Sequence, residues 1–226
     1  MTAQAEDIFI DAPITDILYT LHLSVIDDDD RDHDLAMGIV SRMSDAQLVA
    51  TTGWGQNALH VAVQGCDAEV VDAICKRMTP EQRMLARGDS GDTALHLAMA
   101  SRESTPEVVS VLCRHLTKFD LCRTNGAGQT PLQVAGNAGG IADFEKMEVL
   151  CGHMTKAQLL ISMNDRNCRW HASKELERRN ISLTTPFAKA LLPQTPNRNL
   201  LRRAEEEKRE ISPIKPPFGR APMPRR

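Results

Sequence analysis

A short phrase built around a Leu-His pair recurs between Thr20 and Ala172 and constrains the fold more than any other feature. It reads TLHLS at 20–24, ALHVA at 58–62, ALHLA at 94–98, PLQVA at 131–135 and RWHA at 169–172. Regular spacing of this order is typical of stacked helical units, because one unit cannot bury its own apolar face and packs against its neighbours. The spacing therefore predicts an array of helical repeats.

A second apolar stripe follows three of these phrases. It reads EVVDAICKRM at 69–78, EVVSVLCRHL at 107–116 and EKMEVLCGHM at 145–154, with apolar residues on one helical face. Cys75, Cys113 and Cys151 are equally spaced along the chain and occupy the same place in each stripe. The six cysteines of the chain form no C-x-x-C pair. We expect them to be reduced core residues, with no metal bound.

A hydroxyl residue followed three positions later by Gln comes after most of the second helices. The pairs are Ser44 with Gln47, Thr79 with Gln82, and Thr155 with Gln158, while Thr117-Lys-Phe-Asp120 occupies the equivalent place in another repeat. Such a pair is a capping box, in which the hydroxyl accepts from a backbone amide and the Gln side chain reaches back to the cap. The pattern predicts a short extra helical turn in each repeat.

Glycine-containing turns precede the Leu-His phrases. They read TTGWGQN at 51–57, RGDSGDT at 87–93, TNGAGQT at 124–130 and, without glycine, SMNDRN at 162–167. Glycines 55, 91 and 128 fall in register, as expected where the backbone needs a positive φ. SGDTALHLA and GAGQTPLQVA resemble the G-x-T-P-L-H-x-A signature of the ankyrin-repeat family, and residues 59–75 are similar to its helix-turn-helix stretch.

This resemblance implies an all-α ankyrin-repeat solenoid over residues 14–183. About four to five helix-turn-helix units would each carry a short outward β-hairpin loop, the end units would be degenerate caps, and the curved array would have a concave binding face. In the family the histidine of the phrase makes buried hydrogen bonds, so His60 and His96 are expected to be structural. The same role is expected for Thr79, Gln82, Thr93 and Thr130.

The repeats are longer than is usual for the family. This extra length is loosely similar to ankyrin proteins that intracellular bacteria inject into host cells, as is the acidic block EEEKRE at 205–210. The N-terminus carries acids instead of a basic leader, and no apolar run reaches the ~20 residues of a membrane span. We expect a cytoplasmic protein without a membrane partner, and the looser likeness implies secretion into a host cytoplasm.

The composition changes near residue 180. Eight of the twelve prolines lie in 186–224. Residues 180–226 contain ten Lys or Arg and four Glu, which gives this segment a net charge of +6. Since the whole chain has a net charge of −3, residues 1–179 carry −9. A Pro-rich, apolar-poor segment cannot offset its ordering entropy by burial, so we predict a disordered basic tail at 184–226 and a flexible N-terminus at 1–13. SPIKPPFGRAPMPRR at 212–226 is a candidate polyproline ligand or phosphorylation segment.

Catalytic signals are weak. The chain contains no phosphate-binding loop, nucleophile elbow or H-E-x-x-H motif, and the acidic stretch Asp27–Asp34 lacks the glycine and the closing Glu of a calcium loop. We therefore expect a protein that is not an enzyme and has no catalytic residues, cofactor or metal. One alternative remains a cysteine-dependent enzyme in which Cys122 or Cys168 pairs with a histidine.

Recognition is the function that the pattern favours. We predict a monomeric module that binds a protein partner, and not nucleic acid, through its loops and first helices. The alternatives are that Trp54 packs on the next loop, and that the basic tail itself docks on an acidic surface. The predicted partner-binding residues are Trp54, Gln56, Arg87, Asp89, Asp92, Met99, Asn125, Gln129 and Asn137.

Overall fold

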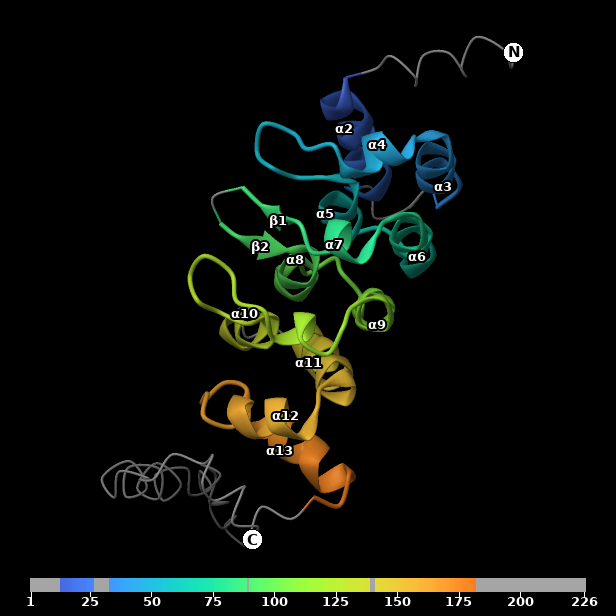
Figure 1. Cartoon of the computed structure of the whole chain (residues 1–226). Helices are drawn as coiled ribbons and strands as arrows, with labels where there is room; N and C mark the ends of the chain where they lie inside the picture. The colour runs from blue at the N-terminus through green and yellow to red at the C-terminus, as the bar shows by residue number, and fades with distance from the viewer. Residues whose placement is uncertain (1–12, 27–32, 89, 139–140, 182–226) are drawn as a thin grey trace, which may run out of the picture.

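A computed structural model describes residues 13–26, 33–88, 90–138 and 141–181. The chain is mostly helical over these ranges, which agrees with the predicted all-α class (Figure 1). Residues 1–12 of the proposed flexible N-terminus, the proposed disordered tail and the acidic residues 27–32 lie outside them. The described residues include no helix long and apolar enough to cross a membrane.

Four helix pairs make up most of the molecule. In Figure 1 they follow one another from the N-terminal to the C-terminal end, with α3, α6 and α9 in one row and α5, α8 and α10 in the other. Contacts within and between pairs connect the whole stack. The pairs are α2 (Ile14–Ile26) with α3 (His33–Arg42), α5 (Ala58–Ala62) with α6 (Ala68–Arg77), α8 (Ala94–Ala100) with α9 (Pro106–His115), and α10 (Pro131–Ala138) with α11 (Ile141–His153).

A short helix follows each second helix, as the capping boxes predict. The boxes of Ser44, Thr79 and Thr155 are all present, with the Gln side chain on the backbone amide of the cap in each. Thr117 and Asp120 make a comparable pair, since the Thr117 hydroxyl donates to the Asp120 carboxylate at 2.6 Å. The short helices are α4 (Asp45–Val49), α7 (Pro80–Arg83), the 3-10 helix η1 (Asp120–Cys122) and α12 (Lys156–Ser162).

The core runs along the stack between the two rows of helices. It is built from Leu, Val, Ile, Met and Ala, together with small buried thiols. Cys75, Cys113 and Cys151 are buried at equivalent places on α6, α9 and α11, and none forms a disulfide. The last described helix, α13 (Arg169–Arg178), packs against α11 and α12 and lies at the C-terminal end of the stack (Figure 1).

The loops that precede α5, α8 and α10 are tight turns, but only one carries strands. In the described chain, the strands β1 (Ala86–Arg87) and β2 (Asp92–Thr93) pair antiparallel in the second loop. In the first and third loops, a backbone bond of 2.9 Å joins the two sides, from Thr52 N–H to Gln56 C=O and from Asn125 N–H to Gln129 C=O. A β-hairpin in every unit, which the resemblance implied, is therefore not what the chain forms.

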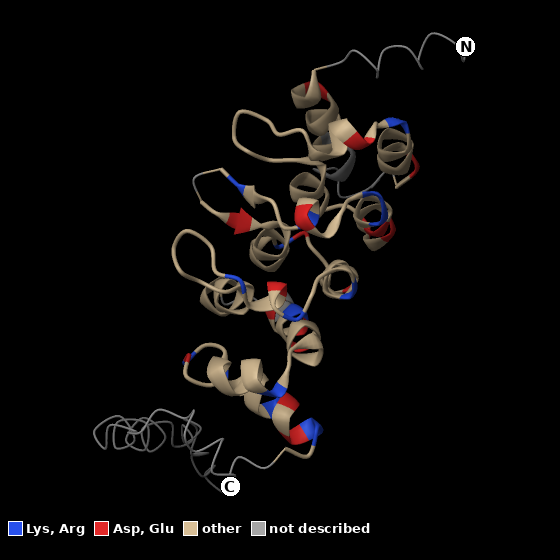
Figure 2. Cartoon of the chain, in the orientation of Figure 1, with Lys and Arg blue, Asp and Glu red and all other residues tan. Residues whose placement is uncertain are grey.

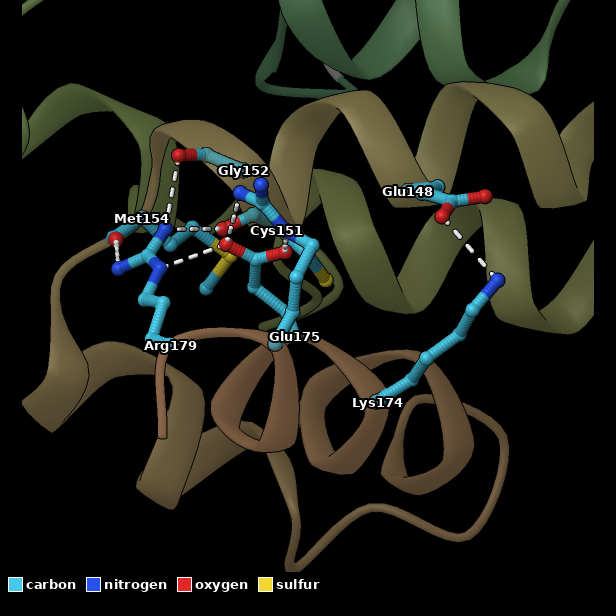
Figure 3. Close-up of polar contacts among 8 residues, drawn as sticks. Glu148, Cys151, Gly152, Met154, Lys174, Glu175 and Arg179 are labelled. Atoms are coloured by element: carbon cyan, nitrogen blue, oxygen red, sulfur yellow. Dashed lines mark hydrogen bonds and ion pairs between the residues drawn. The ribbon is translucent and has the colours of Figure 1, made fainter. Parts of the chain in front are cut away.

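Cationic side chains bind the free carbonyls at the ends of the second helices. Arg77 donates to Val40 C=O at 2.7 Å and to Met43 C=O at 2.5 Å, at the end of α3. Arg179 donates to Gly152 C=O at 2.7 Å, at the end of α11 (Figure 3). These carbonyls have no partner inside their helix and carry the negative end of the helix dipole, so a cation there stabilises the stack. Two more contacts of this kind are made by Arg83 to His115 and by Lys118 to His153.

Lys146 of α11 extends this arrangement into the core. Its side chain is fully buried, and its ammonium donates to Ser101 C=O at 2.6 Å, Ala98 C=O at 3.2 Å and Met99 C=O at 3.3 Å. The Asp143 carboxylate lies 3.0 Å from the ammonium and balances its charge. One buried lysine therefore holds the end of α8 against α11.

Candidate interaction surface

Three loops form a continuous ridge along one edge of the stack, which we call the loop row: residues 51–57, the described residues of 84–93, and 123–130 (Figure 1). The loops touch each other through the backbone. Gly126 N–H donates to Ser90 C=O at 2.9 Å. In addition, the side-chain amide of Asn125 donates to the Asp92 carboxylate at 2.7 Å. A Cβ added at Gly55 would lie 2.4 Å from Gly88 N, so the first two loops are also in close contact.

Trp54 projects from the first loop of the row. Thr52 organises this loop: its hydroxyl accepts from Trp54 N–H and Gln56 N–H, both at 3.3 Å, and its C=O accepts from Gly55 N–H at 2.8 Å. The Trp54 side chain is nevertheless 78% exposed. This exposure argues against the alternative in which the ring packs on the next loop.

The other predicted partner-binding residues are distributed unevenly. Met99 is wrong as a surface residue: it is fully buried, because α8 packs against α5, α9, α10 and α11 and leaves only Ala100 exposed at its end. Asp89 lies outside the described residues. Asn137 is exposed on α10 and accepts from the Asn167 amide at 2.9 Å. The half-buried members of the loop row are Gln56, Arg87, Asp92, Asn125 and Gln129.

His60 and His96 tie the first helix of one unit to the loop of the next. In both, Nδ1 accepts from a backbone N–H at 3.2 Å, that of Asn57 or Thr93. The proton is therefore on Nε2, which donates at 3.0 Å to Leu85 C=O or Gln129 C=O, 25 and 33 residues further along the chain.

Burial keeps both imidazoles neutral. Desolvation lowers the pKa of His60 to about 4 and also lowers the pKa of His96. Gln133 occupies the same position in the next unit: its oxygen accepts from Thr130 N–H at 2.9 Å, and its amide donates to Asp165 at 3.0 Å. All three side chains thus join a first helix to the loop that precedes the next one.

The pKa values of the thiols are raised, whereas a nucleophilic cysteine has a lowered pKa. Burial raises the pKa of Cys122 to about 11 and that of Cys168 to about 12, so both stay protonated at neutral pH. Over the described ranges, no hydrogen bond joins either thiol to an imidazole, and no group of three or more His, Cys, Asp or Glu residues could hold a metal ion.

A second exposed feature lies at the C-terminal end of the stack, and we call it the aromatic cluster: Phe144 of α11 with Trp170, His171 and Lys174 of α13. The His171 ring stacks on Phe144 with centroids 5.3 Å apart and meets Trp170 edge-on at 4.6 Å. Phe144 and Trp170 are 50% and 59% exposed, whereas His171 is buried. The Lys174 ammonium lies 5.0 Å from the centroid of the Trp170 ring.

This cluster was missed by the sequence analysis. RWHA is a degenerate copy of the Leu-His phrase, which predicts a buried residue where Trp170 is exposed. The sequence held one sign of the cluster, which is the Trp at position 170 where the other copies have Leu. Phe144 could not be assigned to it, because it is distant in the sequence and contacts His171 only in the folded chain. His171 also differs from His60: its two ring nitrogens are buried without a hydrogen-bond partner, and burial lowers its pKa.

The loops of the row differ in charge. Figure 2 shows the loop between α4 and α5, which carries Trp54, without charged residues, whereas β1 and β2 of the second loop carry Arg87 and Asp92. A comparison with models of known protein families finds no match to this chain, and a comparison with curated proteins finds none either.

Proposed function

We propose that the chain is a protein-protein interaction module of the ankyrin-repeat type, which binds a partner protein through the loop row. Three features support the repeat assignment. The helix pairs recur with the Leu-His phrase, His60, His96 and Gln133 occupy equivalent linking positions, and the loops between units stack on one edge. Repeat arrays of this kind present extended surfaces for recognition.

The observation that carries the proposal is Trp54. A tryptophan that is 78% exposed on a loop organised by Thr52 presents a large apolar surface without a partner inside the described chain. Ordering the backbone of a loop before binding lowers the entropy lost in the complex. Tryptophan is also among the residues that contribute most to protein interfaces. The uncharged loop around it favours an apolar contact at its centre.

The experiment places a photo-crosslinking amino acid at position 54 and, as a control, at position 19. Tyr19 is an aromatic residue of α2 with similar exposure, 62%, and lies outside the loop row. We expect crosslinking to one protein from position 54 only. Trp54→Ala should then weaken binding of that purified protein about tenfold or more, whereas Tyr19→Ala should not. Equal binding by both variants and the unmodified chain would contradict the proposal.

A further inference from the structure

The aromatic cluster is built differently from the loop row and calls for a different ligand. Its two exposed rings, Phe144 and Trp170, come from different helices and are joined beneath by the buried His171. Because neither nitrogen of His171 has a hydrogen-bond partner, its contacts in the cluster are those of its ring faces and edges. The apolar part of this surface is therefore made of the two exposed aromatic rings, with the His171 ring beneath them.

Aromatic faces of this kind suit proline-rich segments. A polyproline II helix is pre-ordered and docks on surfaces lined with aromatic side chains. A cation already lies over one ring, since Lys174 is 5.0 Å from the centroid of Trp170. Its ion pair with Glu148, at 3.1 Å, has partners that are 50% and 56% exposed, and Figure 3 shows it bridging α13 and α11. Exposed pairs of this kind contribute little, so an arriving arginine can replace Lys174 at small cost.

The chain itself contains a segment with this chemistry. Residues 212–226 hold five prolines and four Lys or Arg, with no acid, whereas residues 1–179 carry a net charge of −9. Glu145 and Glu148 are exposed on α11, beside Phe144 and one turn beyond it. The charge of the segment therefore complements that of the body of the protein on which it would dock.

The connection is long enough for this contact. Residues 182–211 lie between the last described residue, Ile181, and residue 212. A random-coil linker of about 30 residues has a root-mean-square span of roughly 30 Å. Tethering of this kind gives a local concentration on the order of millimolar, so even a weak contact would be populated within one chain.

We propose that the aromatic cluster is a docking site for proline-rich basic segments, and that its occupant is residues 212–226 of the same chain. The contact places the end of the chain over α11 and α13, at the opposite end of the stack from α2. It makes no use of the loop row, so it leaves Trp54 free to engage a partner protein.

The two tryptophans of the chain allow a direct test in the intact protein. With ¹⁵N-labelled tryptophan, the indole N–H groups of Trp54 and Trp170 give one NMR signal each, and each single variant, Trp54→Phe and Trp170→Phe, assigns one of them. Replacing the five prolines of 212–226 by serine should move the Trp170 signal and leave the Trp54 signal in place. Replacing the four Lys and Arg of this segment by glutamine should also move the Trp170 signal.

Further measurements identify the occupant. A synthetic peptide of residues 212–226 should restore the Trp170 signal of the proline variant, and Phe144→Ser should abolish this restoration while the Trp54 signal reports an intact fold. A Trp170 signal that is identical in the unmodified chain and the proline variant would overturn the proposal. A Trp170 signal that shifts on dilution of the unmodified chain would also overturn it, because a second copy would then be the occupant.

Discussion

The central part and the C-terminal end of the stack differ in the polar contacts that hold neighbouring elements together. In the centre, His60 and His96 link each unit to the next through neutral hydrogen bonds to loop carbonyls. At the C-terminal end, His171 makes no such bond, and the polar contacts between α11 and α13 are made by charged side chains. Glu175 of α13, for example, accepts from Arg179 at 2.6 Å, and Arg179 in turn binds the end of α11 (Figure 3).

The loops differ in the same way. Gly55 and Gly91 have φ of 70° and 66°, and each lies against the backbone of the following loop. Gly128 has φ of 73°, yet a Cβ there would meet nothing within 4 Å, because the turn at 162–167 does not continue the row. The glycine turns therefore keep their local conformation as far as Gly128, while their contacts with the following loop change. The following variants test how strongly each region depends on its own chemistry.

The largest effect is expected at Lys146. Lys146→Met removes the ammonium from the C-terminal carbonyls of α8 and from the buried Asp143 carboxylate. Losing one member of a buried pair typically costs about 3–5 kcal/mol. Urea unfolding followed by circular dichroism measures the loss. Lys76→Met is the matched control: this lysine is 67% exposed and pairs with Asp72, so its loss should cost less than about 1 kcal/mol. Similar midpoints for the two variants would show that the end of α8 does not depend on this ammonium.

The next effect separates loop stacking from backbone strain. Gly91→Ala and Gly128→Ala both force a side chain into the left-handed region, at about 1–2 kcal/mol each. Only at Gly91 does the new Cβ also lie 2.7 Å from a backbone atom, Gly126 N, so the next loop must move. We expect Gly91→Ala to cost about 2–5 kcal/mol in total, since overpacking adds about 1–3 kcal/mol to the strain. Equal losses for the two variants in thermal or urea melts would mean that the loop row is not tightly packed.

A third prediction concerns acid. The pKa of His60 is lowered to about 4 from an ordinary value of 6.5, so the unfolded state takes up a proton first as the pH falls. The stability that neutral His60 contributes is therefore complete above pH 6.5 and is lost as the pH falls from 6.5 to about 4. His60→Gln removes this titration and can keep both hydrogen bonds, as Gln133 does.

The size of the acid effect follows from this shift. Between about pH 7.5 and about pH 5, His60→Gln should lose less stability than the unmodified chain by on the order of 2 kcal/mol. Urea melts at a series of pH values measure it. His22→Gln, at an exposed histidine of α2, is the control and should follow the unmodified chain. An acid loss that is unchanged in His60→Gln would show that His60 does not cause it.

The smallest effect compares the same local device in the two regions. Thr79→Ala and Thr155→Ala each remove one capping box, which costs about 0.5–2 kcal/mol. Because the box is made within four residues, we expect similar losses in the centre and at the C-terminal end, both smaller than the loss for His96→Ala, which leaves buried partners unmet. Urea midpoints decide it, and Ser212→Ala in the tail should leave the midpoint unchanged.

What the amino-acid sequence determined by itself is local. The capping boxes of Thr79 and Thr155 and the positive φ of Gly55, Gly91 and Gly128 were all predictable, because each depends on residues within one or two turns. The apolar stripes with Cys75, Cys113 and Cys151 also predicted the buried faces of the second helices, since helical periodicity alone decides which side is apolar.

Only the tertiary structure decided the rest. Met99 is buried because four helices surround α8, and the aromatic cluster forms because α13 lies against α11. The Leu-His phrase keeps its histidine at positions 22 and 171. His22, however, lies in the middle of α2, and the residue before α13, Cys168, has a helical backbone where Asn57 and Thr93 are extended. In α5 and α8 the phrase places the histidine at the start of the helix. The hydrogen bonds of His60 and His96 also need an acceptor carbonyl that lies 25 or 33 residues further along the chain, and only the packing of the next loop brings it close.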